Sequence, residues 1–265
     1  MDPEPSLGDP KEPSRGHTEP CAVILAAGKG TRMKSELPKV LCPVVDRPMI
    51  EFVLDALTAA GIKRHIVVVG YEAEQVKSAL TQRDPPCEFA MQSEQLGTGH
   101  AVQMCREQLA DQSGPTIVLA GDSPLVQPDS LRELLAHFEQ HQPSLLLGTL
   151  HKDDPTGLGR IVRNEAGEFT GIVEHKDATQ AQLAITEVNM STYLFHTPDL
   201  LEVLDQLGNS NAQNEYYLTD CAALLREAGK NVEAIAVLKD CESLSINNPE
   251  QLRLVDETMR SMGYA

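Results

Sequence analysis

Four cationic side chains and two glycines stand close together near the start of a strongly acidic sequence. They follow the apolar run 22–27, while the chain as a whole carries a formal net charge of −17. Small residues after a buried strand let backbone amides approach a ligand closely, and nearby cations offset phosphate charge. A plain strand-to-helix turn would account for the glycines but not for so many cations. The stretch therefore predicts a phosphate-binding loop, with Gly28, Lys29, Gly30, Arg32, Lys34 and Lys39 as its candidates.

Two commoner phosphate-binding motifs do not describe this loop. The Walker pattern GxxxxGK[ST] is absent from the sequence. Read as GxGxxG, the loop has Met33 at the third glycine position, where close packing of helix and strand needs a small residue. The P-loop and dinucleotide-binding classes are therefore disfavoured.

A carboxylate follows another apolar run further along the chain. Gly121 and Asp122 come directly after the run 116–120, which has the length of a buried strand. The Asp122 carboxylate is therefore expected at the carboxyl end of that strand, where ligands bind in open α/β sheets. A cap of the following turn is the alternative role for this side chain.

Strand-like and helix-like segments alternate along the first 150 residues. Apolar runs predict strands at 22–27, 66–70, 87–91, 116–120 and 144–150. Helical periodicity predicts helices at 48–60, 72–80 and 99–109, and a capping box at 130–133 opens another. The alternation predicts an α/β fold, a Rossmann-like, mainly parallel mixed sheet with helices on both faces.

The pattern changes after about residue 150. We expect a hairpin of 159–162 with 168–174, a strand at 187–195, and helices at 198–207, 218–228 and 249–262. Thr197 is the expected cap of the first of these helices, and Asn248 of the last.

Composition sets the domain organisation and the partners. Residues 1–20 hold five prolines and five acids, which predicts a disordered acidic tail, so the domain is expected to span 21–265. The 265 residues contain no stretch of membrane-spanning length, no secretory signal and no hexapeptide repeat of a left-handed β-helix.

The negative net charge disfavours nucleic acid and acidic membranes as partners. The six scattered cysteines favour reduced thiols, and so a location in the cytoplasm.

The loop at 25–39 resembles the signature LxxGxGTRMxxxxPK of the sugar-1-phosphate nucleotidyltransferases, and every motif position is met. The resemblance implies the nucleotide-diphospho-sugar transferase fold. It also implies that the strand end and loop hold the nucleotide, through Leu25, Ala26, Ala27, Gly28 and Gly30. Arg32 would clamp the triphosphate, and Lys39 would lie on the reacting phosphates.

Segment 92–101 is similar to the QxEQLGTGHA segment of the N-acetylglucosamine-1-phosphate uridylyltransferases within that family. The similarity implies that Gln92 and Gly97 read the uracil edge and that Thr98 supports them. A glutamine amide offers both a donor and an acceptor, which suits an imide.

Residues 121–125 resemble the family's GDxPL pattern, which implies that Asp122 is a ligand of Mg²⁺. Its partner in the family is a late asparagine, and Asn247 in the stretch 246–249 is the matching candidate. Two protein oxygens, completed by phosphate oxygens and water, are what magnesium usually accepts.

Three further segments resemble the family's sugar-binding motifs TGYGRI, VEHKDA and EIN. The resemblance implies that Gly159, Glu174 and Asn189 hold the acetamido sugar and that Lys176 lies near its phosphate. The sequence departs from the family's pattern where a tyrosine, a second tyrosine and a glycine are replaced by Ala120, Leu158 and Asn214. The first two departures leave the exact sugar open.

The implied reaction transfers UMP from UTP to N-acetylglucosamine 1-phosphate and releases pyrophosphate. Alternatives are a uridylyl- or thymidylyltransferase for glucose 1-phosphate or another sugar 1-phosphate, and a silent sugar-nucleotide-binding module. A molybdopterin-type nucleotidyltransferase shares the early loop, but the segments around Gln92, Glu174 and Asn189 fit it poorly. The oligomeric state, monomer or dimer, stays open.

Overall fold

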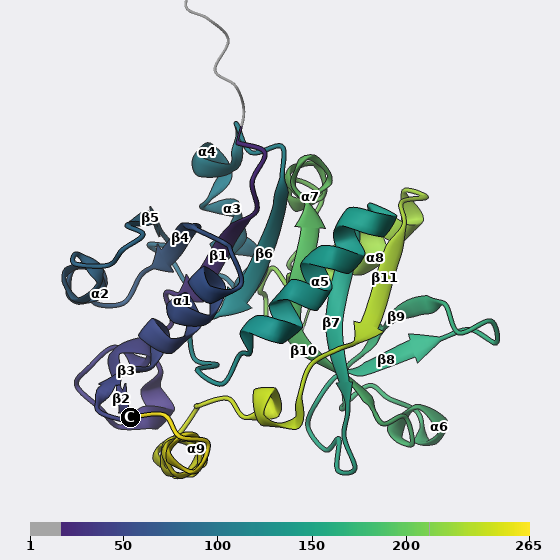
Figure 1. The fold of residues 1–265 in the computed structure, drawn as a ribbon. Coiled ribbons are helices and arrows are strands. Elements are labelled where there is room, and N and C mark those ends of the chain that lie inside the picture. Colours follow the sequence, from purple (N-terminus) through teal and green to yellow (C-terminus); the bar gives the residue numbers. More distant parts are fainter. Residues whose placement is uncertain (1–16, 212) are drawn as a thin grey trace, which may run out of the picture.

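A seven-strand path forms the centre of the molecule in the computed structural model, which describes residues 17–211 and 213–265 (Figure 1). Across the sheet the order is β11 (Val232–Ala236), β7 (Leu145–His151), β10 (Glu187–His196), β6 (Pro115–Ala120), β1 (Cys21–Ala26), β4 (Arg64–Val69) and β5 (Cys87–Met91). β1 pairs in parallel with β4 and β6, β4 with β5, and β7 with β11, whereas β10 runs antiparallel to β6 and β7. The predicted mainly parallel mixed sheet is confirmed.

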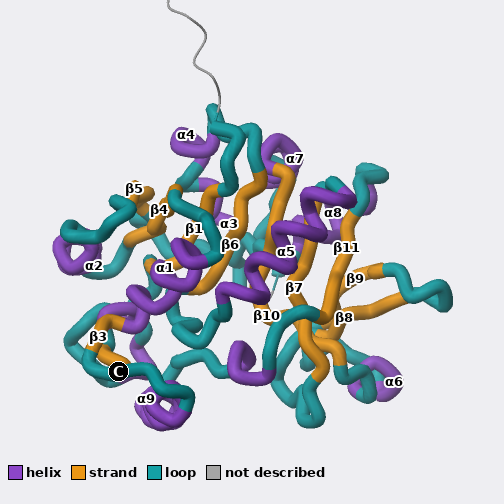
Figure 2. Tube along the Cα trace, viewed as in Figure 1, coloured by secondary structure: helices purple, strands orange, loops and turns teal. Residues whose placement is uncertain are grey.

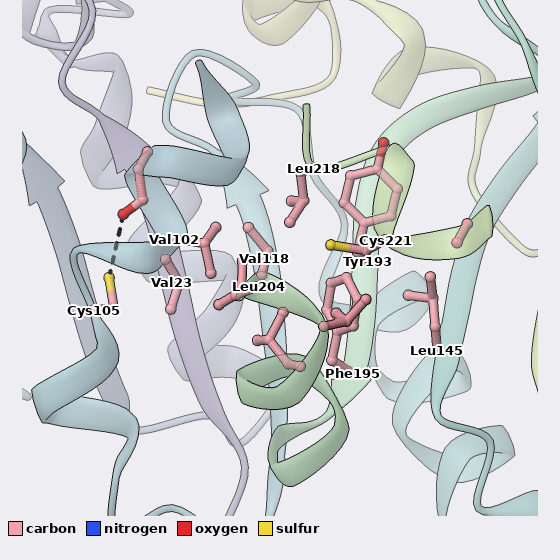
Figure 3. Close-up of a cluster of buried hydrophobic side chains, with 14 of the residues drawn as sticks. Val23, Val102, Cys105, Val118, Leu145, Tyr193, Phe195, Leu204, Leu218 and Cys221 are labelled. Atoms are coloured by element: carbon pink, nitrogen blue, oxygen red, sulfur yellow. Dashed lines mark hydrogen bonds between the residues drawn. The ribbon is translucent and has the colours of Figure 1, made fainter. Parts of the chain in front are cut away.

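Helices cover both faces of this sheet because successive residues of its central strands point to opposite sides. Val23 of β1 packs with α3 (Thr98–Gln103), α4 (Arg106–Leu109), α7 (Thr197–Leu204) and α8 (Asp220–Glu227), in the cluster of Figure 3. Its neighbours Ala22 and Ile24 pack with α1 (Met49–Ala59), α2 (Ala73–Leu80) and α5 (Pro128–His141).

A short hairpin and a C-terminal helix complete the domain. β8 (Arg160–Arg163) and β9 (Phe169–Val173) form the hairpin, which joins β10 through one residue pair and precedes α6 (Gln180–Leu183). After β11 the chain continues mainly as loop (Figure 2) to α9 (Pro249–Ser261). α9 packs beside the two-stranded ribbon of β2 (Pro43–Val44) and β3 (Arg47–Pro48).

Several element boundaries differ from the sequence prediction. The expected helix at 99–109 is two helices, α3 and α4, separated at Met104 and Cys105. The capping box at 130–133 is not a helix start, because α5 already begins at Pro128 and the Ser130 hydroxyl donates to Glu242 instead. Thr197 is the first residue of α7 rather than its cap, which is His196, and its hydroxyl donates to the Gly114 carbonyl.

The C-terminal cap is as predicted, since the Asn248 side chain accepts from the amide of Gln251 at 2.9 Å. β11 was missed by the sequence prediction, although four of the five residues in its sequence VEAIA at 232–236 are apolar.

Of the predicted N-terminal tail, residues 1–16 lie outside the described residues. His17 to Pro20 pack on the domain, with the His17 amide donating to the Asp111 carbonyl at 2.7 Å and its carbonyl accepting from Ser113 at 2.8 Å. Within the described ranges, no helix has the length and apolarity needed to cross a membrane.

Candidate active site

The loop after β1 has a backbone conformation at Gly30 that favours glycine. Gly30 has φ +62°, and the loop then makes two short 3₁₀ turns, Thr31–Met33 and Lys39–Leu41. A Cβ atom on Gly30 would lie 2.5 Å from the Cβ of Lys39. Glycine is therefore required at position 30 by conformation and by space, because Lys39 packs directly over it.

Four predicted site residues meet in one cluster of cations and oxygens. The Lys39 ammonium donates to the Asp122 carboxylate and, at 2.8 Å, to Oδ1 of Asn247. Arg32 donates to the same Asn247 oxygen at 3.1 Å. The amide of Ile246 donates to the Asp122 backbone carbonyl at 3.1 Å, which holds the two oxygen-bearing segments side by side. Residues more than 80 positions apart in sequence are thus brought together at the carboxyl ends of β1 and β6.

The donor set of this cluster suits a hard divalent cation. The Asp122 and Asn247 oxygens both point to one positive centre, which in this structure is the Lys39 ammonium. A carboxylate and an amide oxygen are ligands that Mg²⁺ accepts, completed by phosphate and water. Among residues 17–211 and 213–265 no group of three or more His, Cys, Asp or Glu side chains forms a metal site.

A buried carboxylate that sequence reasoning missed supports the Asn247 segment. Glu242 accepts from the Gln127 amide at 3.0 Å and from the Ser130 hydroxyl at 2.6 Å, and so ties residues 239–247 to the start of α5. Burial raises the pKa of Glu242, and the hydrogen bonds from Ser130 and from the backbone amides of Lys239 and Gln127 offset only part of that rise. Its sequence context carried no signal for this role.

A cavity of about 210 Å³ adjoins the loop at the end of β1. It contains six of the eight residues predicted to hold the nucleotide, and is lined by Leu25, Ala27, Gly28, Gln92, Gln95, Gly97, Thr98, Ala101 and Glu215. Gly30 lies outside it, under Lys39. The side chain of Ala26 is not brought to the cavity, because it is buried in the core on the opposite face of the sheet.

Internal hydrogen bonds fix the orientation of Gln92 in this cavity. Its amide nitrogen donates to the Gly97 carbonyl at 3.1 Å and lies 3.0 Å from Nδ1 of His100. Gly97 has φ +107°, and a Cβ there would lie 2.5 Å from the Tyr216 carbonyl oxygen. Thr98 accepts from the Leu218 amide at 3.1 Å. The turn after Gln92 is therefore locked against residues 215–218, and His100 is a contact that sequence reasoning did not assign.

The predicted sugar residues gather around the hairpin and β10: Gly159 directly precedes β8, Glu174 directly follows β9, and Asn189 lies in β10. The backbone amide of Asn189 donates to the backbone carbonyl of Gly159 at 2.9 Å. A Cβ on Gly159 would lie 3.5 Å from Oε1 of Glu174 and 3.7 Å from the Cβ of Asn189. Lys176 lies in the turn after β9 and is exposed. The structure thus brings three of the four together.

Asn189 is held by a partner that sequence reasoning missed. Its Nδ2 donates to the Tyr193 hydroxyl at 2.8 Å, and its Oδ1 accepts from the Ser191 amide at 3.2 Å across a bulge in β10. Burial raises the pKa of Tyr193 to about 12, so its hydroxyl stays neutral. The tyrosine lies in the apolar part of its strand, which in sequence predicts only core.

Glu187, the first residue of the segment 187–189 that resembles the family's EIN motif, has a structural role. Arg163 donates to its two oxygens at 2.7 and 2.6 Å, and Thr149 donates at 2.6 Å. Burial raises the pKa of Glu187, but the hydrogen bonds and charge of Arg163 outweigh it, and the pKa lies below its ordinary value.

A cavity of about 210 Å³ beside a cation–oxygen cluster, at the carboxyl ends of a mainly parallel sheet, is the arrangement of a nucleotide-binding α/β protein. The model of the MobA-like NTP transferase domain matches residues 22–215. The chain belongs to this family, and the nucleotidyltransferase class predicted from the loop at 25–39 is confirmed.

Curated relatives with higher sequence identity belong to one kind of protein. The chain is 49% identical over 239 residues to the bifunctional protein GlmU of an Exiguobacterium strain, covering 90% of this chain and 52% of that protein. It is 44% identical to the bifunctional protein GlmU of Shouchella clausii, with 90% and 52% covered. The chain therefore spans about half the length of these relatives.

Solved structures confirm the fold. A crystal structure of UDP-glucose pyrophosphorylase complexed with UDP-glucose superposes with a TM-score of 0.73 and covers 92% of this chain and 99% of its own. The two sequences are only 19% identical, so this likeness concerns the fold alone.

Proposed function

We propose that the chain transfers UMP from UTP to N-acetylglucosamine 1-phosphate, giving UDP-N-acetylglucosamine and pyrophosphate. The observation that carries the proposal is the cluster of Lys39, Arg32, Asp122 and Asn247 beside the cavity that holds Gln92. The identity of 43 to 49% to GlmU proteins supports the same reaction.

The proposed chemistry is an in-line displacement at phosphorus. An oxygen of the sugar phosphate forms a bond to the α-phosphorus of UTP, and the bond from that phosphorus to the bridging oxygen of pyrophosphate breaks. The nucleophile is already anionic, so no general base is needed. Catalysis then rests on positioning and charge neutralisation.

Each residue has a task in that displacement. Arg32 offers a planar fork for the triphosphate, and Lys39 a compact charge for the reacting phosphates. Lys39 leaves the Asp122 carboxylate when it turns to the phosphates. Asp122 and Asn247 would hold Mg²⁺, which when bound supplies Lewis-acid stabilisation of phosphate charge.

The base and sugar ends complete the proposal. The Gln92 amide and the backbone at Gly97 face the uracil, supported by Thr98, with Leu25, Ala27, Gly28 and the backbone of Ala26 beside the base. Gly159, Glu174 and Asn189 hold the acetamido sugar, and Lys176 approaches its phosphate. The six free cysteines support a reducing, cytoplasmic location.

Pyrophosphate release by the purified chain tests the proposal. UTP and Mg²⁺ are supplied with N-acetylglucosamine 1-phosphate or glucose 1-phosphate, and dTTP replaces UTP in a parallel series. We expect strong preference for UTP and the acetylated sugar. Preference for glucose 1-phosphate, which the departures at Ala120 and Leu158 make the second candidate, would overturn the substrate but keep the chemistry. No release with any pair would favour a silent binding module.

A further inference from the structure

A third hydrophobic cluster packs between α9 and the ribbon of β2 and β3, which lie side by side in Figure 1. It is separate from the two clusters on the faces of the central sheet. Val255 and Met259 come from α9, and Val44 and Val45 come from the ribbon. We call this group of side chains the α9 cluster.

The α9 cluster lies directly behind the cation–oxygen cluster. Four segments of the chain bring the cation–oxygen cluster together, and each of them also buries one side chain in the α9 cluster. These side chains lie one to three residues from the site residue of their segment and are Met33, Cys42, Leu125 and Ile246. Because packed interiors are nearly incompressible and transmit small shifts, the placement of the site residues depends on how α9 packs.

The tip of the ribbon has an unfavourable backbone conformation. Val45 has φ +46° and Asp46 has φ +64°, both in the left-handed region. This region costs energy for a residue with a Cβ atom, and a β-branched residue such as valine is rarely found there. Val45 is nevertheless buried, with only 2% of its surface exposed. Such a conformation persists only where surrounding contacts hold it.

Asp256 of α9 supplies one of these contacts. Its Oδ1 accepts from the backbone amide of Val45 at 2.7 Å. Arg260, one turn further along α9, donates to Asp256 at 2.8 Å and to Asp46 at 3.2 Å. The hydrogen bonds from Arg260 and from the Val45 amide hold the pKa of Asp256 below its ordinary value. The carboxylate is therefore charged at neutral pH and is a strong acceptor for the amide.

The ribbon continues directly from the turn that carries Lys39. The Cys42 amide donates to the Lys39 carbonyl at 3.1 Å, and the Met49 amide donates to the Cys42 carbonyl at 3.2 Å. These bonds join the base of the ribbon to the 3₁₀ turn Lys39–Leu41, while Asp256 bonds to its tip. Only two residue pairs of β2 and β3 separate the base from the tip, so a change at the tip reaches Lys39 over a short path.

We propose that Asp256 is a positioning residue for Lys39, because its bond to Val45 holds the left-handed turn that, together with the α9 cluster, fixes the Lys39 ammonium at the oxygens of Asp122 and Asn247. The proposal rests on the proposed uridylyl transfer. Loss of this bond should lower kcat about tenfold, since a shift of about 1 Å in a catalytic group can cost up to about 10² in rate. The KM for the sugar 1-phosphate should stay unchanged, because the sugar residues lie on other elements.

The test is a double-mutant cycle between Asp256 and Val45. Asp256→Ala removes the acceptor, and Val45→Gly lets the turn adopt its positive φ without strain. We expect Asp256→Ala to lower kcat about tenfold in the unchanged chain, but less than about twofold in the Val45→Gly background. The second comparison is made between two Val45→Gly proteins, so the cost of losing the buried valine side chain cancels.

Two control variants separate positioning from general stabilisation. Asp256→Asn keeps an oxygen that accepts from the Val45 amide, so its kcat should stay close to that of the unchanged chain. Glu257→Ala removes an exposed carboxylate of the same helix, which pairs with Arg253 at 2.6 Å, and should leave kcat unchanged. Thermal unfolding checks that each variant is folded at the assay temperature.

Hydrogen exchange gives a readout that does not depend on activity. The backbone amides of residues 39–45 should exchange faster with solvent in Asp256→Ala, because the turn and the ribbon open more often. In Glu257→Ala the exchange of the same amides should match that of the unchanged chain.

An equal fall in kcat with and without Val45→Gly would overturn the coupling and leave the proposed function intact. Normal kcat in folded Asp256→Ala would do the same, as would a raised KM for the sugar at unchanged kcat. Absence of activity in the unchanged chain would instead reject the uridylyl transfer itself. Unchanged exchange of residues 39–45 in Asp256→Ala would show, independently of activity, that Asp256 does not hold the turn.

Discussion

The proposed phosphate end of the candidate site, around Lys39 and Asp122, and its proposed sugar end, around Asn189, differ in how their charged groups are arranged. At the phosphate end the charged groups already contact one another, because Lys39 is bonded to Asp122 and Asn247, and Arg32 shares the Asn247 oxygen. The Lys39 side chain is only 13% exposed and that of Asp122 20%, so water does little to weaken their attraction. A charged ligand must exchange these partners as it binds.

The sugar end is built from a fixed backbone and neutral groups. Asn189 is buried, and its amide is held by Tyr193 and by the backbone of Ser191. The charged candidates there, Glu174 and Lys176, are exposed. Shape is therefore set before a ligand arrives, and little internal charge has to be rearranged.

This contrast implies two kinds of mutational response. Changes at the phosphate end should alter affinity for metal and phosphate and the rate of transfer, with little effect on folding. Changes around β10 should act mainly on stability and on the fit of the sugar.

The largest expected effect is that of Lys39→Met. Turnover should fall by about 10² to 10³, the typical cost of removing one donor that stabilises developing charge, with the fold intact. The metal-free protein should nevertheless bind Mn²⁺ several-fold more tightly, because a cation that competes for the Asp122 and Asn247 oxygens is gone. Stopped assays and a Mn²⁺ titration by electron paramagnetic resonance measure the two effects.

The charge-matched control is Lys63→Met, an exposed lysine before β4, at the other end of the sheet. It should leave both quantities unchanged. Near-normal turnover in Lys39→Met would remove this residue from the proposed chemistry, and unchanged Mn²⁺ affinity would show that it does not compete for the metal oxygens.

Asp122→Asn tests the same cluster by changing one of the two oxygen-bearing side chains that bond to Lys39. The change removes a negative charge but keeps an oxygen, so the Mg²⁺ concentration for half-maximal activity should rise about tenfold or more. A magnesium titration of initial rates measures it. A titration curve that superposes on that of the unchanged chain would contradict the metal assignment.

Arg163→Met tests the stability of the sugar end. It leaves the buried Glu187 carboxylate without its cationic partner, which should cost about 2 to 3 kcal/mol at pH 7, less than for a fully buried pair because Arg163 is partly exposed. Urea unfolding measures this cost.

The pH dependence follows from the lowered pKa of Glu187. A carboxyl with a folded pKa below its unfolded value, roughly 4.3, contributes stability above that pH and loses it as pH falls through the folded pKa. Without Arg163, burial alone raises the pKa of Glu187 in the variant. The difference between the two proteins should therefore shrink as pH falls from that raised pKa towards the lowered pKa of Glu187 in the unchanged protein. A difference that stays constant with pH would show that the ion pair is not its source.

The smallest expected effect is that of Ser191→Gly. Ser191 has φ +55° in the bulge beside Asn189, a backbone region that costs a side chain energy and a glycine little. Part of the gain is offset by the greater freedom of glycine in the unfolded chain, so Tm should rise by only about 1 to 2 °C. Ser191→Ala keeps the Cβ atom and should show no rise. Equal melting temperatures for all three proteins would mean that the bulge carries no strain.

The two ends also differ in how far they follow from sequence. We predicted the phosphate end from the apolar run that ends in Ala27, from the glycines of the loop and from Asp122. A buried strand followed by a turn is visible in the sequence as an apolar run followed by small and polar residues. At the sugar end Gly159, Glu174 and Asn189 came only from family resemblance. Tyr193 was missed, because a buried tyrosine in an apolar strand looks like core.

By itself, the sequence determined most of the elements and their order, the mainly parallel sheet and the residues that follow its strands, because these depend on short-range periodicity and on turn chemistry. Tertiary structure alone decided that Lys39 bonds the oxygens of Asp122 and Asn247 and that Glu242 ties the Asn247 segment to the start of α5. Such contacts join residues 83 to 208 positions apart, and only packing in three dimensions brings them together.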